Sequence, residues 1–380
     1  MKTIPFATPM LDQNEFNAVK KVLNSPILTH GPNSRKFELD FKKKFNFKFA
    51  HSVGSCTAAL HLSYMALNLK KGDEVIVPNQ THVSTVHTLE ILGAKPIFID
   101  SNINDGNINV DLIENKINNK TKAITVVHYL GAPAQMEKIL TLCKKYKIYL
   151  IEDCALSIGA KFKNKFVGSF GDFACFSFYP AKHMTTADGG MLVCKNEKNF
   201  KKTKLLKGFG VDKNFYERKI PGNYDVVSMG LNYRMNEVSS ALGIFQLKKL
   251  NNFIKKRREN YNFLKNHLKD INTIKILNSG SEKKNTSSYY CLTIILNKYK
   301  KNKRFEIIKK IKSFGIGTSI HYPKPVSDFK YYKKKYNISN KSFPIAKQLS
   351  YQSINLPIGP HLSKKQLIYI ASKVQVLLKS

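Results

Sequence analysis

The sequence predicts an α/β fold, in which a mainly parallel central sheet is covered by helices and followed by a smaller α+β domain. Between residues 50 and 195, short apolar runs alternate with stretches of helical periodicity, as expected for parallel strands joined by helices. Further along, the pattern changes to one long amphipathic helix and then to alternating apolar stretches. We therefore expect a large domain over residues 1–247 and a small C-terminal domain over residues 248–380.

The strands of the large domain are predicted by brief apolar runs that end in polar or small residues: "DEVIVP", "KPIFID", "KAITVVHYL" and "KIYLIEDCA". Ahead of them, "TAALHLSYMALNL" has apolar residues at helical spacing and predicts a helix. In open parallel sheets, ligands bind beyond the carboxyl ends of the strands. Functional residues are therefore expected directly after these runs.

The second part of the chain begins with a long amphipathic helix, whose apolar positions include Val238, Leu242, Phe245, Leu250 and Phe253. It is followed by the alternating stretch "YYCLTIILN", a predicted helix "RFEIIKKIKSF" and the stretch "IGTSIHYP". This order of elements predicts the smaller α+β domain.

Composition excludes several classes of protein. The 380 residues are 42% apolar and 11% aromatic, which predicts a folded chain with a sizeable core. No apolar run approaches the roughly 20 residues of a membrane span, and the N-terminus lacks the apolar region of a signal peptide. The six cysteines form neither a CxxC pair nor a Cys/His metal spacing, which predicts buried thiols and no metal site. We expect a cytoplasmic protein with no membrane partner.

The net charge of +37 has two interpretations. Lysine is scattered along the chain together with Asn and Ile, a texture that biased codon usage produces without selection for a basic surface. Alternatively, a positive field steers an anionic, phosphorylated small molecule. No recognisable nucleic-acid-binding module is present, so no nucleic-acid partner is expected.

A candidate phosphate site lies in "VGSCTAALHL", residues 53–62. Small residues lead straight into a helix, and the free N–H groups and dipole of a helix N-terminus favour an anion. Ser55 and Thr57 add hydroxyl groups. The same residues are also typical of a simple N-cap before a buried helix.

Two further candidates are a carboxylate and a lysine. Glu152 and Asp153 end the apolar run "KIYLIEDCA", as loop-start residues or as functional acids at the rim of the sheet. Lys182 lies in the loop "YPAKHMTTADGG" between the predicted strands "ACFSF" and "MLVC". Most lysines are surface residues, but this loop ends in Gly189–Gly190, which suits a backbone packed close against a ligand.

Pyridoxal phosphate (PLP) would use all three groups at once. It needs an anion site for its phosphate, an acid to keep its ring nitrogen protonated and a lysine to hold it as an imine. His82, in the loop "PNQTHVST", is in a plausible place for a ring that stacks on the cofactor. A lone histidine there is otherwise a hydrogen-bonded loop residue.

Ordered motifs along nearly the whole chain carry a resemblance. They are "ILTHGPNSRKFELDFKKKF", "SCTAALHLSYMAL", "GDEVIVPNQTHVSTVHTL", "LGAKPIFID", "IEDCALSIGA", "GSFGDFACFSFYPAKHMTTADGGML", "GLNYRMNEVSSALGIFQLKKL", "IGTSIHYPKPV" and "LPIGPHLS". The sequence resembles the PLP-dependent sugar aminotransferases of the DegT/DnrJ/EryC1/StrS group. This resemblance implies the PLP-dependent transferase fold of aspartate aminotransferase, type I.

The resemblance also implies roles for individual residues. Lys182 is expected to be the Schiff-base lysine, Asp153 to pair with the pyridine nitrogen, and His82 to lie over the cofactor. The phosphate-binding positions are matched by Cys56, Thr57, Ala58 and Ser177. Asn232 matches a residue that reaches the phosphate from the neighbouring subunit, which implies an obligate homodimer. Arg234 belongs to the same motif and is interpreted as structural or phosphate-binding.

Two residues depart from the family pattern, and one neighbour is unexplained. Leu156 stands where many members have Gln or His to bond the phenolic oxygen of the cofactor. Cys56 stands where glycine is common, a small-for-small change. His183, directly after the lysine, has no role from the sequence alone.

The expected reaction transfers an amine from glutamate to a nucleotide-linked keto sugar, a keto-6-deoxyhexose, for polysaccharide or glycoconjugate biosynthesis. "LTHGP" and "HYPKP" are candidate substrate-facing stretches. One alternative is a 3-dehydratase of the same family that uses the aminated cofactor, pyridoxamine phosphate; such enzymes carry His at the lysine position. A second is a non-catalytic regulatory or nucleic-acid-binding relative, which the intact lysine, aspartate and phosphate cup argue against.

Overall fold

The computed structural model describes residues 3–213, 217–282, 284–297 and 303–379. Its α-helices are α1 Gln13–Leu23, α2 Pro32–Phe45, α3 Cys56–Ala66, α4 Ser84–Ile91, α5 Met136–Tyr146, α6 Glu197–Leu206, α7 Glu237–Leu268, α8 Lys303–Ser313, α9 Lys330–Tyr336, α10 Pro344–Gln352 and α11 Lys364–Lys379. Short 3₁₀ turns lie at η1 Val110–Leu112, η2 Glu114–Lys116, η3 Tyr129–Gly131 and η5 Val326–Asp328.

The strands are β1 Phe49–Val53, β2 Glu74–Pro78, β3 Lys95–Ile99, β4 Thr121–Val127, β5 Tyr149–Asp153, β6 Lys161–Phe162, β7 Lys165–Phe166, β8 Phe173–Ser177, β9 Gly190–Cys194, β10 Ile274–Ile276, β11 Leu292–Leu296 and β12 Ser353–Leu356. Each apolar run predicted as a strand in the large domain overlaps one of them. "IGTSIHYP" differs, because it forms only isolated bridges, Ile4 with Ile316 and Ser319 with Asn355.

The central sheet is mainly parallel, as predicted. Within the described residues it has seven strands in the order β1-β9-β8-β5-β4-β2-β3. Strand β9 runs antiparallel to both of its neighbours, whereas the pairings from β8 to β3 are all parallel. The carboxyl ends of β2, β4, β5 and β8 therefore meet at one edge.

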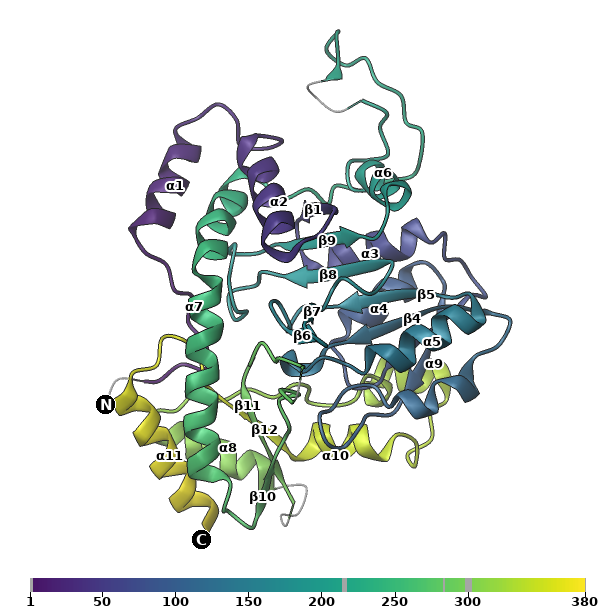
Figure 1. Ribbon diagram of the computed structural model, residues 1–380. Helices are drawn as coiled ribbons and strands as arrows, with labels where there is room; N and C mark the ends of the chain where they lie inside the picture. The colour runs from purple at the N-terminus through teal and green to yellow at the C-terminus, as the bar shows by residue number, and fades with distance from the viewer. Residues whose placement is uncertain (1–2, 214–216, 283, 298–302, 380) are drawn as a thin grey trace.

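Helices cover both faces of this sheet (Figure 1). On one face α3 and α4 pack over Val75, Ile151 and Leu192. On the other face α2 and the first half of α7 enclose a group of phenylalanines, and α5 covers the β4–β5 side. Phe41 of α2, for example, packs edge-on against Phe176 of β8 with 5.3 Å between ring centroids. Among the described residues, no helix combines the length and apolar character that crossing a membrane requires.

The second layer is a small antiparallel sheet of order β10-β11-β12, covered by α8, α11 and the second half of α7. Ile4 joins its core, since Ile4 N–H donates to Gly315 O at 2.8 Å and Ile4 O accepts from Gly317 N–H at 2.7 Å. Both chain ends accordingly lie on this side of the molecule (Figure 1).

The expected domain boundary near residue 247 falls inside α7, which continues from the large sheet to the small one (Figure 1). Val326 and Tyr332, from the second part of the chain, pack in the same cluster as α3 and α4. The side chain of Asn79, after β2, accepts from Ser327 N–H at 2.9 Å. The division into a domain of residues 1–247 and a domain of residues 248–380 therefore stays a prediction. Residues of the second part contact the large sheet and its helices.

Glu237, at the start of α7, fastens the N-terminal helices to the large sheet. Its buried carboxylate accepts hydrogen bonds from the backbone N–H groups of Gly31 (3.0 Å), Asn33 (2.7 Å) and Ser34 (3.0 Å), at the start of α2. A Cβ at Gly31 would lie 2.5 Å from Glu237 Oε2, so a larger residue there would displace the Glu237 side chain. Burial acts to raise the pKa of Glu237, but the hydrogen bonds from Ser34 and Asn33 outweigh it and lower the pKa.

We expect Glu237→Ala to lower the free energy of unfolding by about 3 kcal/mol, because it leaves buried N–H donors without an acceptor. In the wild type, this contribution is complete above the unfolded-state pKa of about 4.3 and is lost as the pH falls below it, because the folded-state pKa is lowered. Urea denaturation across pH measures both. Glu259→Ala, an exposed change on the same helix, should cost under ~0.5 kcal/mol; equal costs would contradict the role of Glu237.

Candidate active site

Asp153 ends β5 at the carboxyl edge of the central sheet and is buried. Its Oδ2 accepts from the Thr85 hydroxyl of α4 at 2.9 Å, and its Oδ1 accepts from Ala155 N–H at 3.0 Å. These bonds satisfy the carboxylate without a cationic partner in direct contact. The strand end thus presents an oriented, buried acid, as the position of Asp153 in the sequence predicted.

Lys182 lies in the loop between β8 and β9, and its Nζ sits 5.6 Å from the centre of the Tyr290 ring. Burial lowers the pKa of its amine, while the Cys56 thiol and the Asp153 carboxyl act to raise it. The three groups are thus within electrostatic reach of one another. The fold brings together residues that the sequence places far apart.

The start of α3, residues 55–58, forms the predicted phosphate site, called the phosphate cup below. The Ser55 hydroxyl caps the helix by accepting from Ala58 N–H at 3.1 Å. The N–H groups of Cys56 and Thr57 stand in the first turn, where a helix leaves its donors unpaired. Ser55 is therefore an N-cap, and the turn still offers N–H groups to an anion.

Gly190 and Ser177 lie beside this cup. Ser177, the last residue of β8, pairs with Gly190 of β9. A Cβ at Gly190 would lie 2.8 Å from Cys56 N and 2.6 Å from Ser55 C, so β9 approaches the cup closely only because residue 190 is glycine. The predicted phosphate-binding positions Cys56, Thr57, Ala58 and Ser177 thus occupy one place.

His82 lies in the loop after β2 with part of its side chain open to solvent, and it is both a hydrogen-bonded loop residue and a neighbour of the site. Its Nδ1 is 2.8 Å from the Ser84 hydroxyl, and its ring centroid is 5.7 Å from that of Tyr322. Burial lowers the pKa of His82, and the charges of Asp153 and Lys182 also act on it.

His321 and Tyr322, from the stretch "HYPKP", lie within electrostatic reach of Lys182 and Asp153 respectively. The ring Nδ1 of His321 lies 3.4 Å from Asn355 Oδ1. The backbone N–H of His321 donates to the same oxygen at 3.0 Å. Burial, and then the charge of Lys182, lower the pKa of His321 to about 4, so the ring is neutral near pH 7. Burial raises the pKa of Tyr322, and the Asp153 charge adds to this.

Tyr290 was missed by the sequence reasoning, because it belongs to an apolar stretch that predicts only a strand. Leu156 packs in the same buried cluster as Tyr290, and its carbonyl accepts from the Ser288 hydroxyl at 3.0 Å. His183 has a structural contact: its Nε2 lies 2.9 Å from Ser288 O, and burial lowers its pKa. The lysine loop is thereby attached to the segment that carries Tyr290.

Asn232 and Arg234 lie on the segment that leads into α7. Asn232 is exposed and bridges to Gly208, while Arg234 bridges to Val53 of β1 and lies 5.0 Å from the Phe209 ring centre. This segment completes an arm, residues 209–213 and 217–231, that extends away from the body above α6 (Figure 1). Arg234 contributes to that structure, and the side chain of Asn232 is exposed.

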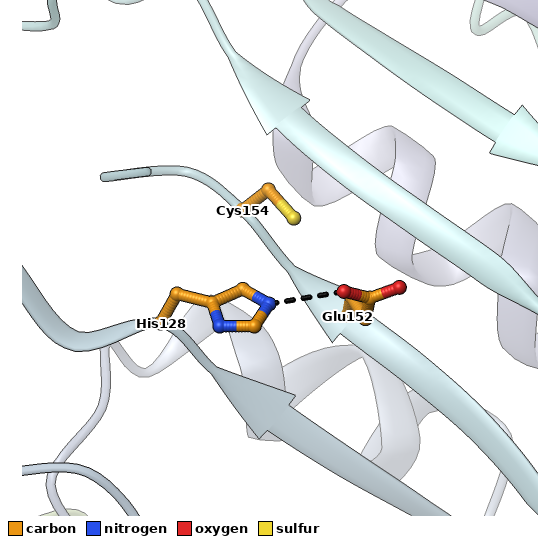
Figure 2. Close-up of side chains that lie close together, drawn as sticks. All are labelled: His128, Glu152 and Cys154. Carbon is orange, nitrogen blue, oxygen red and sulfur yellow. Dashed lines mark hydrogen bonds and ion pairs between the residues drawn. The ribbon is translucent and has the colours of Figure 1, made fainter. Parts of the chain in front are cut away.

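Behind Asp153, the buried Glu152 holds a polar cluster with His128 and Cys154 (Figure 2). Glu152 accepts from His128 Nε2 (3.1 Å) and from the N–H groups of Gly168 (2.7 Å), Phe170 (2.8 Å) and Gly171 (2.6 Å). The other ring nitrogen of His128 accepts from Ala134 N–H at 3.0 Å.

Candidate ligand atoms of His128, Glu152 and Cys154 lie within 4.8 Å of one another, which raises the question of a metal site. The imidazole nitrogens and the carboxylate are already used in hydrogen bonds, and burial raises the pKa of the Cys154 thiol, which keeps it protonated. A metal ligand would have to be a free imidazole nitrogen or a thiolate. The cluster is therefore an anchor that fixes the end of β5.

We expect Glu152→Gln to lower the free energy of unfolding by about 3 kcal/mol, because its amide group turns a donor toward buried N–H groups. Glu114→Gln, at an exposed ion pair with Lys145, is the matched control and should change it little. Thermal unfolding of the wild type with and without EDTA tests the metal interpretation. A chelator-dependent Tm would show that the cluster holds an ion.

The fold and the site together define an enzyme of the aminotransferase class, and comparison with known proteins agrees. The profile of the DegT/DnrJ/EryC1/StrS aminotransferase family matches residues 9–375. The chain belongs to this family. The predicted family, type I fold and aminotransferase class are thereby confirmed.

The chain is similar to GDP-perosamine synthase of Escherichia coli O157:H7, with 36% identity over 98% of each protein. It is 37% identical to the UDP-4-amino-4,6-dideoxy-N-acetyl-β-L-altrosamine transaminase of Campylobacter jejuni, over 87% of this chain and 86% of that one. Among solved structures, Helicobacter pylori PseC, an aminotransferase involved in pseudaminic acid biosynthesis, superimposes with a TM-score of 0.92 at 31% identity, over 100% of both chains.

Proposed function

We propose that this protein is a PLP-dependent aminotransferase that moves an amine from glutamate to the ketone of a nucleotide-linked keto sugar, a keto-6-deoxyhexose. The product is an amino sugar for polysaccharide or glycoconjugate biosynthesis. One observation carries the proposal: a buried lysine amine, a buried carboxylate and a helix N-terminus lie together at the carboxyl edge of the sheet.

The residues present fit the cofactor. The α3 turn offers N–H and hydroxyl groups for a phosphate, and the close approach of Gly190 keeps that turn against β9. Asp153 supplies a buried acid for the ring nitrogen, and Lys182 supplies an amine that can form an imine. PLP supplies the electron sink that amine transfer requires and that no side chain provides.

Lys182 has the properties of the proton carrier. Burial lowers the pKa of its amine, which increases the unprotonated fraction near neutral pH. An amine with that pKa serves as a base toward the substrate carbon, and its conjugate acid returns the proton. The Tyr290 ring lies under this amine, with 5.6 Å between Nζ and the ring centre.

His321 and Tyr322 are proposed to contact the sugar. Both belong to the stretch "HYPKP", both are close to Lys182 or Asp153 in electrostatic terms, and His321 keeps a neutral ring. One relative is named as a GDP-perosamine synthase and another as a transaminase of a UDP-linked amino sugar, which supports a nucleotide-linked substrate here. The positive charge of the chain favours such an anionic substrate.

The 3-dehydratase alternative is disfavoured, because residue 182 is lysine and the ring of His183 is hydrogen-bonded to Ser288 O. A dehydratase of this family carries His in place of the lysine, but the imidazole of His183 is buried against Ser288 O. The non-catalytic alternative does not explain why a lysine amine is buried with a lowered pKa, since burying an amine costs free energy.

We further propose a cytoplasmic homodimer in which Asn232 reaches the phosphate cup of the other subunit. The arm exposes Val226 (61%), Val227 (56%) and Met229 (78%), apolar side chains that favour burial against a second chain. All six cysteines are free, which suits a reducing compartment.

We expect Lys182→Ala to lose the yellow absorbance of the purified protein and to lower turnover at least about a thousandfold, since it removes both the imine and the proton carrier. Asp153→Asn should retain the cofactor poorly and lose most activity. Absorbance spectra and turnover with glutamate and a panel of nucleotide-linked keto sugars measure both. Lys201→Ala, at an exposed ion pair, is the control; an imine that survives in the Lys182 variant would refute the assignment.

The shared site is tested by mixing two inactive homodimers, Lys182→Ala and Asn232→Ala. After subunit exchange, about half of the dimers are hybrids with one intact site each, so up to about a quarter of wild-type activity should return. If Asn232 acts within its own subunit, the hybrids contain no intact site and no activity returns.

A further inference from the structure

A small cavity lies between the N-terminal segment, α7 and the loop from β8 to β9 that carries Lys182, called the lysine loop. It is lined by residues 8–10, by residues 182–185 of the lysine loop, and by Gln246 and Arg257 of α7, among others. The space open to the centre of a water molecule is about 10 Å³. A cavity of this size holds about one water molecule and is too small for an organic ligand.

Two residues that line this cavity carry unpartnered polar atoms. His183 is 3% exposed and Arg257 is 4% exposed. Within the part of the chain that the structure describes, neither His183 Nδ1 nor Arg257 Nε has a hydrogen-bond partner. Their other contacts point elsewhere, because His183 Nε2 lies 2.9 Å from Ser288 O and Arg257 Nη1 donates to Tyr290 O at 2.8 Å, and neither acceptor residue lines the cavity. Buried polar atoms rarely lack a partner, so these two nitrogens indicate a bound molecule.

The two nitrogens have opposite hydrogen-bonding roles. The carbonyl oxygen of Ser288 can only accept, so His183 Nε2 carries a proton and donates it. Burial lowers the pKa of His183 well below its usual value, so the ring is neutral and Nδ1 is an acceptor. Arg257 Nε–H is a donor. A molecule that contacts both must therefore donate and accept, which water does and a simple anion does not.

Gln246, which is also buried, offers a third contact in the lining. Its Nε2 donates to Met10 O at 2.8 Å. Its Oε1 accepts from Thr185 N–H at 3.3 Å, and an amide oxygen has a second lone pair. A water molecule in the cavity can thus donate to His183 and to this oxygen and accept from Arg257. Three such bonds are typical of a buried water.

We propose that this cavity binds one structural water molecule, which donates to His183 Nδ1, accepts from Arg257 Nε and so ties the lysine loop to α7. The link acts on Lys182 from two sides. The water holds the residue next to Lys182, and Arg257 also holds the carbonyl of Tyr290, whose ring lies under the Lys182 amine. Arg257 is therefore a positioning residue for Lys182. The water site stands without the proposed function, whereas the positioning role rests on it.

A high-resolution crystal structure of the PLP-loaded wild type tests the water directly. We expect one density peak at hydrogen-bonding distance, about 2.7–3.2 Å, from both His183 Nδ1 and Arg257 Nε. A second crystal soaked in sodium bromide is the control for an anion, because bromide gives an anomalous signal. An empty cavity, a direct contact between the two nitrogens, or a bromide peak in the cavity would each overturn the proposal.

The positioning role is tested with Arg257→Lys, which keeps the charge but loses Nε–H and the fork that serves two acceptors. We expect the apoenzyme of this variant to form the imine with PLP about tenfold more slowly, and kcat to fall about tenfold, while both KM values stay unchanged. Absorbance after addition of PLP and steady-state kinetics measure these. Arg258→Lys, at the exposed neighbour on α7, is the matched control and should equal the wild type. An unchanged imine rate, or a general rise of both KM values, would overturn the positioning role.

The failure of this inference and the failure of the proposed function give different results. If the proposed function is wrong, the wild type forms no imine with PLP, whatever the cavity holds. If this inference is wrong, the wild type forms the imine, but its cavity contains no water or Arg257→Lys forms the imine as fast as the wild type.

Discussion

The active site depends on one buried carboxylate that is not expected to touch the substrate. Glu152, near the end of β5, is hydrogen-bonded to His128, which follows β4, and to backbone N–H groups of residues 168–171. These bonds hold both segments against the end of β5. A carboxyl group buried this deeply is tolerated only when its oxygens accept several hydrogen bonds. Those bonds fix the backbone that carries Asp153, so the position of Asp153 depends on the hydrogen bonds of Glu152.

The second constraint is the contact between the lysine loop and the second part of the chain. His183 meets Ser288 O, and the Arg257 guanidinium of α7 donates to Tyr290 O at 2.8 Å. Burial lowers the pKa of Arg257 to about 10. Tyr290 in turn lies under the Lys182 amine. The large sheet carries Asp153, and α7 holds the segment that places Tyr290 under Lys182.

Much of this arrangement could be predicted from the sequence, because parallel strands end at one edge of a sheet. Asp153, the α3 turn and Lys182 each follow or flank an apolar run, so their meeting is a consequence of strand order. Other features depend on contacts between distant segments, such as Glu237 with Gly31 and Asn79 with Ser327. No local pattern marks these pairs, since each partner alone is an ordinary polar or small residue.

The same limit explains why the domain division by sequence is simpler than the structure. A change of periodicity near residue 247 reports the start of a long helix, and that helix serves both sheets. Ile4, near the N-terminus, packs in the core of the small sheet, and Tyr332, from the second part of the chain, packs in the core of the large sheet. Hydrophobic burial is indifferent to chain order, so a periodicity reading locates elements but not their partners.

The neighbouring residues Lys182 and His183 have different surroundings. The lysine amine lies over the Tyr290 ring and within electrostatic reach of Asp153, whereas the histidine nitrogen is bound to Ser288 O. Under the proposed function, residue 182 decides the chemistry, because His183 is held at Ser288 and does not take the place of the lysine. Burial lowers the pKa of the Lys182 amine, which under the proposed function makes this amine a better base. Burial also lowers the pKa of His183, so its ring stays neutral while it contacts Ser288 O.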